Sequence, residues 1–459
     1  MTRLTRAVVA PSAPAIRLTI VLAIVLPVVL SGGCSNPPLI RPSLKDAPTH
    51  ERYSRALEEF GLDNVALGRD WLAAAARALA EPRPATLPFE ETGYIAADKP
   101  VAVAYRIDLR KGRRLSVAVT FESSQPSRFF VDLFEDRDDD EPRRVSGLEP
   151  GQTAFEYDVR RDGVYLLRLQ PELLRGGRYV VTQRTLASIS SPVEGFVVAQ
   201  VSSGFGAPRD GGGRDHHGID IFRPHGTPVL AAVDGSVRVD ESPRGGRVIW
   251  LRDARAARNF YYAHLNDWAV EHGAVVRTGD VIGYVGNTGN AQTTPPHLHF
   301  GVYERGPGDP VPYLQRDDPA PKPANVPLER LGEWVRVART STPFTSAAPD
   351  PGSSLRAPSV MLARGTVGRV LAAVGGQYWL LLPDGRSGFV RAADVTTAAT
   401  AVTSASHQGP VLESPRTDAI IVVAALDRVR RLPVRGYFGE FALVELPDAR
   451  LGWALIESQ

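Results

Sequence analysis

Three histidine-containing stretches decide the interpretation of this sequence: Asp215-His216-His217-Gly218-Ile219-Asp220, Tyr261-Tyr262-Ala263-His264-Leu265 and Pro296-His297-Leu298-His299-Phe300. The chain has nine histidines in 459 residues, and five of the nine lie in these stretches. Imidazole and carboxylate groups are common ligands of transition metals, so their clustering favours a metal site. We therefore expect the segment from 216 to 299 to carry the chemistry of the chain.

The local backbone decides whether His216 and Asp220 can hold one ion. In a straight strand, side chains four residues apart share a face but stand roughly 13 Å from each other. Glycines at 211–213 and at 218 permit a tight curl that brings the two side chains together. The same glycines, with Pro224 after them, argue against a helix. The sequence therefore predicts a curled segment at this point.

His297 and His299 lie in an apolar run that predicts a strand. Side chains two residues apart on a strand point to the same side, about 7 Å from each other, so only one of them need contact a metal. A catalytic zinc has three N and O ligands at about 2.0–2.2 Å and keeps a fourth position open. Two histidines and one aspartate meet this count. His264 and one member of the 297/299 pair then remain for proton transfer and oxyanion stabilisation, which predicts metal-assisted amide hydrolysis.

Other short motifs surround these stretches in a fixed order: Ser203-Gly204-Phe205-Gly206 with Arg209, Gly226-Thr227-Pro228-Val229, Asp234-Gly235, Gly279-Asp280-Val281-Ile282-Gly283 and Gly286-Asn287-Thr288-Gly289. Together with HxxxD, a histidine after aromatic residues and HxH, they make the segment 203–302 resemble the LytM/lysostaphin-type zinc metallopeptidases. The resemblance implies a zinc-dependent endopeptidase that acts on peptidoglycan. It says nothing direct about the rest of the chain.

Position by position, the resemblance implies that the zinc ligands are His216, Asp220 and His299, and that the catalytic histidines are His264 and His297. It also selects His216 over His217, which stands three residues before Asp220 and would otherwise compete as a ligand. Two positions depart from the family pattern. Pro295 stands where glycine is frequent, and Gly301 stands where an acidic residue is common.

Several other residues receive a structural interpretation. The remaining histidines are expected to be surface or satisfied core residues: His50, His225, His272 and His407. The glycine-rich segments 204–206 and 286–289 are expected to be turns, since neither lies between a strand and a helix as a phosphate loop does. The acidic run 138–141 is interpreted as a solvated loop rather than a calcium site.

Composition limits the classes of function. A length of 459 residues predicts several domains, and 43% hydrophobic with 23% charged residues is typical of globular proteins. The net charge of +2 and the absence of a basic patch in the sequence predict no nucleic-acid partner.

The first 33 residues have the pattern of a lipoprotein signal peptide. Basic residues precede the apolar run Leu18–Leu30, and Ser31-Gly32-Gly33-Cys34 follows it. Cys34 is the single cysteine of the chain, which excludes an intramolecular disulfide and predicts a lipid attachment point. An uncleaved N-terminal anchor is the alternative. By analogy with Gram-negative sorting, Ser35 favours the outer membrane, so we expect a lipid anchor at the periplasmic face of the envelope.

The expected fold class is mainly β and multidomain. Apolar spacing predicts two short helices between Glu51 and Glu81, and a period of two predicts a β-sandwich after them. A repeat offset by 64 residues pairs 382–389 with 446–453. The predicted domains are 34–91 (tether and helices), 92–188 (β-sandwich), 189–316 (zinc metallopeptidase, antiparallel β with an open groove), 317–330 (proline-rich linker), 331–398 and 399–459 (two small SH3-like barrels).

These observations lead to one hypothesis and two alternatives. The hypothesis is a lipid-anchored zinc endopeptidase that cuts peptide stems or cross-links of peptidoglycan. The first alternative is a non-catalytic LytM-type activator whose partner is a cell-wall amidase. The second is an SH3-like scaffold with a vestigial enzyme. Both alternatives fit poorly with a chain that keeps all five site residues.

Overall fold

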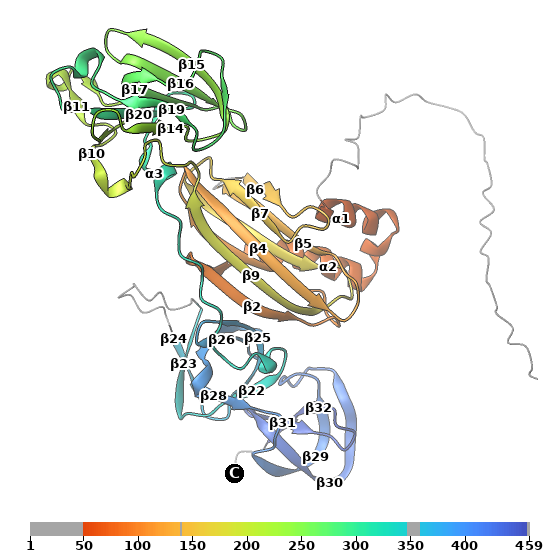
Figure 1. Cartoon of the computed structure of the whole chain (residues 1–459). Helices are drawn as coiled ribbons and strands as arrows, with labels where there is room; N and C mark the ends of the chain where they lie inside the picture. Colours follow the sequence, from red (N-terminus) through yellow and green to blue (C-terminus); the bar gives the residue numbers. More distant parts are fainter. Residues whose placement is uncertain (1–48, 138–139, 347–358, 457–459) are drawn as a thin grey trace, which may run out of the picture. The chain divides into compact units, whose positions relative to one another are not determined.

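The computed structural model describes residues 49–137, 140–346 and 359–456. The predicted signal peptide, Cys34 and the tether up to residue 48 lie outside these ranges. Strands predominate and helices are few (Figure 1), which confirms the predicted mainly-β, multidomain fold class. No helix within the described ranges is long and apolar enough to cross a membrane.

The first described elements are helical: α1 (Thr49–Glu59), the 3-10 helix η1 (Leu62–Asn64) and α2 (Ala66–Ala80). Gly61 separates α1 from η1 with φ 68°, a conformation that glycine adopts without strain. Leu57 and Trp71 are buried and pack against Phe130 of the following sandwich. The two short helices that the apolar spacing predicts are therefore confirmed.

A β-sandwich follows. One sheet has the order β1 (Arg83–Pro84), β3 (Val103–Leu109), β8 (Gly163–Pro171), β5 (Phe129–Arg137), β6 (Asp140–Gly147). The facing strands have the order β2 (Phe89–Ile95), β9 (Gly177–Ala187), β4 (Arg113–Ser123), β7 (Ala154–Asp158). One core joins both sheets, with Tyr105 and Leu167 from the first and Leu115 and Val181 from the second at 0% exposure.

Part of the acidic run differs from the expected loop. Asp140 and Glu141 begin β6, while residues 138–139 lie outside the described ranges. The strand is stabilised by pairing with β5, where buried Glu135 forms an ion pair with Arg143 at 2.5 Å. Cross-strand charge pairs of this kind are invisible to a reading of local composition.

The domain that carries the histidine stretches is built on one antiparallel sheet. Its order is β10 (Val201–Ser203), β13 (Ile219–Phe222), β20 (His297–Tyr303), β17 (Asn259–Trp268), β16 (Gly246–Asp253), β15 (Gly235–Ser242), β18 (Val275–Val276). Attached to it are β14 (Pro228–Leu230), β19 (Val281–Val285) and β21 (Pro307–Gly308), and nearby lie the hairpin β11 (Pro208–Arg209) and β12 (Arg214–Asp215) and the helix α3 (Val311–Leu314). In β20, Leu298 and Phe300 are fully buried in the core, so the alternating His297 and His299 point to the opposite face.

The proline-rich segment after α3 contains no helix or strand up to Pro327, as expected of a linker. It is nevertheless held in place. The Asp318 carboxylate accepts hydrogen bonds from the Thr185 main-chain N at 2.8 Å and from its Oγ1 at 2.7 Å. Ala324, Val326 and Leu328 then pack on the core of the next unit.

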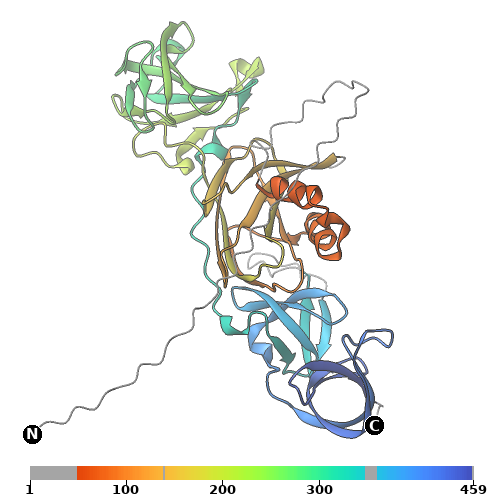
Figure 2. The ribbon, with the colours of Figure 1, turned by 90° about the vertical axis from the view of Figure 1, so that its right-hand side faces the viewer.

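The two C-terminal units consist of strands, apart from the 3-10 helices η5 (Leu328–Arg330) and η6 (Ala392–Asp394) of the first unit. The first contains β22 (Trp334–Val337), β23 (Ser341–Thr345), β24 (Ser359–Ala363), β25 (Val367–Val374), β26 (Gln377–Leu381), β27 (Ser387–Arg391) and β28 (Val395–Thr397). The second is a closed barrel of β29 (Thr403–Leu412), β30 (Ile421–Phe438), β31 (Phe441–Glu445) and β32 (Leu451–Leu455), visible as a ring of strands in Figure 2. The first unit differs from an isolated barrel because β25 pairs with β2, opposite Thr92 and Gly93.

The sequence repeat corresponds to one turn that occurs twice. The Leu382 N donates to the Arg386 O at 2.8 Å, and the Leu446 N donates to the Arg450 O at the same distance. Gly385 has φ 89° in the first turn, and Ala449 has φ 65° in the second. The repeat therefore marks equivalent hairpins, β26–β27 and β31–β32.

Candidate active site

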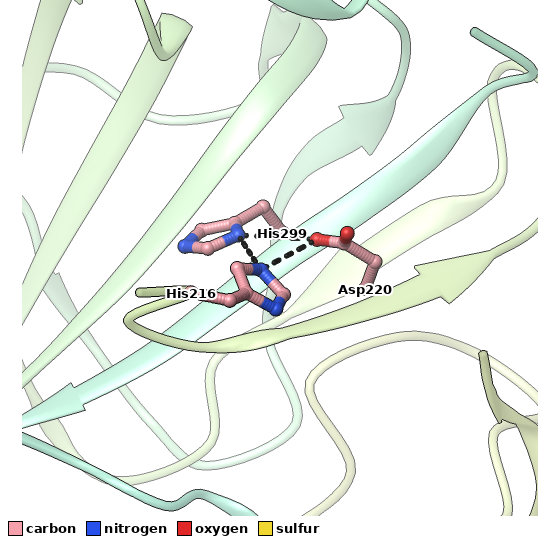
Figure 3. A group of neighbouring side chains, drawn as sticks. All are labelled: His216, Asp220 and His299. Atoms are coloured by element: carbon pink, nitrogen blue, oxygen red, sulfur yellow. Dashed lines mark hydrogen bonds and ion pairs between the residues drawn. The ribbon is translucent and has the colours of Figure 1, made fainter. Parts of the chain in front are cut away.

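The three residues expected to bind a metal converge on one point (Figure 3). The Nε2 atom of His216 lies 2.9 Å from Nδ1 of His299 and 3.1 Å from Oδ1 of Asp220, and the last two atoms are 3.1 Å apart. Tetrahedral zinc with bonds of about 2.0–2.2 Å spaces its ligand atoms by about 3.3–3.6 Å. The side chains therefore stand close to the spacing that this ion requires.

Strand pairing and a glycine bring these residues together. Asp220 on β13 lies directly opposite His299 on β20. His216 reaches them because the chain bends between β12 and β13. A Cβ at Gly218 would be 2.5 Å from the Phe300 O and 2.8 Å from the His299 ring, so only glycine fits there. The expected curl is present, and the need for Gly218 is steric.

Main-chain and arginine contacts orient the donor atoms. Nδ1 of His216 is 2.9 Å from the Gly204 O, which can only accept, so Nδ1 carries the proton and Nε2 keeps its lone pair. Arg209 donates to Oδ2 of Asp220 at 2.5 Å and leaves Oδ1 facing His216. Two acceptors, Nε2 and Oδ1, thus face each other at 3.1 Å. A cation between them would stabilise this arrangement.

The protonation states suit a metal ligand set. Burial raises the pKa of Asp220, but the adjacent imidazoles of His216 and His299 lower it by more, so the carboxyl group is ionised. Burial lowers the pKa of His299, although Asp220 counteracts part of the effect. An ionised aspartate and a neutral histidine are the forms that bind a metal.

His264 and His297 lie beside this cluster with their rings 5.0 Å apart. Nδ1 of His264 is 2.8 Å from the Thr288 O, and Nδ1 of His297 is 2.9 Å from the Pro295 O. Each Nδ1 therefore donates to a carbonyl, which leaves Nε2 for proton exchange, and Nε2 of His297 lies 4.0 Å from Oδ1 of Asp220. Burial lowers the pKa of His264 to about 4, so this imidazole is neutral near pH 7. The structure thus brings all five expected site residues together.

A bulge in β17 turns His264 toward the cavity. Tyr262 pairs with Ile249 and Leu265 pairs with Arg247, so two residues of β17 oppose one residue of β16. His264 has φ 64°, a strained backbone conformation for a residue other than glycine. The strain is held by a hydrogen bond from the His264 N to the Gly245 O at 2.8 Å. No glycine or proline marks this bulge in the sequence.

The site opens into a cavity of about 700 Å³. Besides the five site residues, its lining includes aromatic side chains from three neighbouring strands, two arginines of the β11–β12 hairpin and one of the β15–β16 turn: Trp250, Tyr261, Tyr303, Arg209, Arg214 and Arg244. Sequence reasoning noted Arg209 only as part of a motif, and it did not identify Trp250, Tyr303 or Arg244. Their positions depend on strand register and loop contacts rather than on local pattern.

The two departures from the family pattern have different structural roles. Pro295 supplies a main-chain carbonyl to His297, which any residue could provide. At Gly301 a Cβ would be 2.9 Å from the His217 O and 2.9 Å from the Tyr303 ring. The Tyr303 side chain therefore occupies the space that an acidic side chain at 301 would need. His217 is exposed and lines the cavity, but it is not part of the cluster of His216, Asp220 and His299.

Comparisons with known proteins agree with this geometry. Residues 214–311 match the model of peptidase family M23. The L-Ala–D-Glu endopeptidase of Bacillus subtilis is 41% identical over 102 residues, which are 20% of this chain and 31% of that protein. The DD-carboxypeptidase/endopeptidase Mpg of Neisseria meningitidis is 39% identical over 124 residues, which are 26% of this chain and 28% of that protein. The chain thus spans less than a third of the length of these curated relatives.

Among solved structures, one match is the catalytic domain of lysostaphin from Staphylococcus simulans. The match covers 26% of this chain and 94% of the lysostaphin chain, with 32% sequence identity and a TM-score of 0.23. All five site residues lie inside the segment that the family model matches. Residues 214–311 of this chain are therefore a domain of peptidase family M23, of the LytM/lysostaphin type.

Proposed function

We propose that this chain is a zinc-dependent metalloendopeptidase that cuts peptide stems or cross-links of peptidoglycan. The observation that carries the proposal is that His264 and His297 line the same cavity as the three expected metal ligands. Their Nδ1 atoms are bonded to carbonyls, so their Nε2 atoms are the ones that can exchange protons. Two relatives, an L-Ala–D-Glu endopeptidase and a DD-carboxypeptidase/endopeptidase, support cleavage of a bond that involves a D-amino acid.

The donor set fits zinc. His216 would bind through Nε2, Asp220 through Oδ1 and His299 through Nδ1, the atoms that face one another. A bound zinc ion supplies Lewis acidity, which polarises a carbonyl and strengthens water as a nucleophile. Three N and O ligands with a fourth position open to the cavity are typical of catalytic rather than structural zinc.

His264 and His297 would handle protons and charge. A neutral imidazole with a bare Nε2 accepts a proton from the attacking water. Once protonated, the same N–H can donate to the oxyanion or return the proton to the departing amine. The hydrogen bonds from Nδ1 to the Thr288 and Pro295 carbonyls keep each ring in the required tautomer.

The alternative is a non-catalytic activator that binds a cell-wall amidase. An activator would need the groove but would have no use for two correctly oriented proton-transfer groups. The complete set of five residues therefore favours the enzyme.

A digest of purified sacculi separates the two functions. The full chain, loaded with zinc, should release new free amines from sacculi, and mass spectrometry of the fragments should identify the cleaved bond. The same protein stripped of metal should release none, and zinc should restore the reaction. Stimulation of an added amidase without any amine release by the zinc-loaded chain alone would show the activator instead.

A further inference from the structure

The turn between β15 and β16 fixes one arginine at the wall of the active-site cavity. The Asn290 N donates to the Arg244 O at 3.0 Å, and the Gly245 N donates to the Ser242 Oγ at 2.9 Å. The next carbonyl, Gly245 O, accepts the hydrogen bond from the His264 N at 2.8 Å. The backbone of Arg244 is thus tied to the strand that carries a catalytic histidine.

The Arg244 guanidinium is available for a ligand. The two carboxylates on the same hairpin already have partners, because Asp240 pairs with Arg238 at 2.9 Å and Glu241 pairs with Arg247 at 3.2 Å. Arg244 itself is exposed and lines the cavity. Its guanidinium makes no hydrogen bond or ion pair with any residue in the described ranges 49–137, 140–346 and 359–456.

The charge of the cavity is unbalanced. Arg244 lines it without pairing to either carboxylate of its own hairpin, and Asp220 is the one carboxylate among the described lining residues. Asp220 is already engaged by Arg209 and faces the ligand cluster. At 301, where the family pattern often has an acid, this chain has glycine. The walls therefore attract an anionic substrate.

We propose that Arg244 determines specificity by binding a free carboxylate on the substrate peptide. Guanidinium groups bind carboxylates through paired N–H donors, which gives both strength and geometric selectivity. Since Arg244 lines the cavity that holds the five site residues, the carboxylate that it binds belongs to a residue close to the scissile bond.

The inference rests on the proposed function and names its substrate class. The preferred substrates are peptides with an acidic side chain or a free α-carboxylate next to the cleaved bond. Uncharged peptides, such as oligoglycine bridges or amidated stems, are poorer substrates. Neutralising that carboxylate by amidation would weaken cleavage without changing the length or shape of the peptide.

A matched pair of synthetic peptides tests this inference. One peptide carries a D-glutamate with a free α-carboxylate beside the scissile bond, and the other carries the corresponding amide. For the zinc-loaded full chain, kcat/KM should be about tenfold or more higher for the acid, the scale of one charged hydrogen-bonded contact. The ratio should fall as salt is raised from 0.05 to 0.5 M, because the attraction is screened.

The decisive comparison is between variants of Arg244 and a variant of an arginine outside the cavity. In Arg244→Gln the acid-to-amide ratio should fall toward one, and in Arg244→Lys part of it should return, since lysine supplies charge without paired donors. Arg277→Gln, an exposed arginine outside the cavity lining, should keep the wild-type ratio.

Two kinds of result would overturn the inference, and they are distinguishable. Equal cleavage of both peptides by the wild type would refute the role of Arg244 in specificity. So would an Arg244→Gln variant that loses activity equally on both peptides. Neither result would refute the proposed endopeptidase activity. Failure to cleave either peptide or sacculi would refute the enzyme, and the inference with it.

Discussion

Three imidazoles of the site are oriented by the same kind of contact. In each, Nδ1 lies 2.8–2.9 Å from a main-chain carbonyl, in the pairs His216–Gly204, His264–Thr288 and His297–Pro295. A carbonyl oxygen cannot donate, so Nδ1 carries the proton in all three rings, which leaves Nε2 as the ligand atom of His216 and as the proton-transfer atom of His264 and His297. At position 288 the side chain also contributes, because the Thr288 hydroxyl accepts a hydrogen bond from the Arg247 N and donates one to the Leu265 O.

Gly218 gives the sharpest test at the level of a single residue. Gly218→Ala places a methyl group 2.5 Å from the Phe300 O and 2.8 Å from the His299 ring, so the ligand must move. We expect zinc occupancy and hydrolysis to fall together, by about tenfold or more, because small displacements of a ligand set are costly. Zinc content and amine release measured on the same preparation check this.

Gly204→Ala is the matched control. Gly204 also neighbours a ligand through its carbonyl, but a Cβ there would meet nothing within 4 Å. This variant should bind zinc like the wild type. If Gly218→Ala retained as much zinc as Gly204→Ala, the steric account of the curl would be wrong.

At the residue scale, the sequence allowed the five site residues to be proposed but not their supporting contacts. Spacing left His217 and His297 open as ligands, and the resemblance to the LytM/lysostaphin type implied the set of His216, Asp220 and His299. The contact of Arg209 with Asp220 and the space that Tyr303 takes beside Gly301 arise where segments distant in sequence meet. Such contacts have no local pattern.

At the scale of elements, regular alternation was readable and buried polar groups were not. Strand β20 follows the expected pattern, with Leu298 and Phe300 in the core. Strand β2 begins at Phe89, before the expected start of the sandwich at residue 92, and Glu91, 1% exposed, interrupts its apolar face. Hydroxyls of Tyr105 and Tyr179 each donate to that carboxylate at 2.6 Å, which makes its burial tolerable.

The environment of His50 predicts how the stability of the folded chain depends on pH in the acid range. Its ring stacks on Trp71 at 4.8 Å, its Nε2 lies 2.7 Å from the Gln170 Oε1, and burial lowers its pKa to about 4. The unfolded chain binds this proton near pH 6.5, so the stability from the neutral form is complete above pH 6.5. This contribution to the free energy of unfolding is lost as the pH falls toward 4. At pH 5 the loss amounts to about 2 kcal/mol.

Urea unfolding at pH 7.5 and pH 5, followed by tryptophan fluorescence, measures this effect. In His50→Gln the loss of stability between the two pH values should be about 2 kcal/mol smaller than in the wild type. The exposed His272→Gln should retain the wild-type difference. Identical pH dependence in His50→Gln and the wild type would contradict the assignment.

For the whole molecule, the site and the C-terminal units are separable by their positions in the chain. Every site residue precedes Asp318. A chain that ends at Asp318 therefore keeps the whole site and also the contacts between Asp318 and Thr185. A chain ending at Asp318 should therefore still hydrolyse soluble muropeptides but bind sacculi less, if the two C-terminal units raise the local enzyme concentration on the insoluble wall. Pelleting with sacculi and peptide hydrolysis are the two measurements.

Removal of these units uncovers the edge of β2 that pairs with β25, so the truncated protein must first be shown to be monomeric by size-exclusion chromatography. Equal pelleting of the full and truncated chains would exclude a role in wall binding. The two units, which the sequence predicts to be SH3-like, would then have only a structural role.

Membrane attachment remains a proposal from the sequence, since Cys34 lies outside the described residues. We expect Cys34→Ala to lose fatty-acid labelling and to leave the membrane fraction or remain unprocessed, because no other cysteine exists to accept a lipid. Cys34→Ser, which keeps a small polar side chain, should behave in the same way. A variant that still labels with a fatty-acid probe and still pellets with membranes would contradict the lipoprotein interpretation.

The central claim is that three of the five site residues hold zinc and two transfer protons. Zinc per chain, measured by plasma spectrometry beside amine release from sacculi, tests it directly. His216→Ala and Asp220→Ala should lose metal and hydrolysis together, because two ligands hold zinc poorly. His264→Ala and His297→Ala should keep zinc near the wild-type content while hydrolysis falls by roughly a hundredfold or more. The account would be contradicted if the zinc-loaded wild-type protein released no amine. It would also be contradicted if His264→Ala or His297→Ala hydrolysed sacculi as well as the wild type.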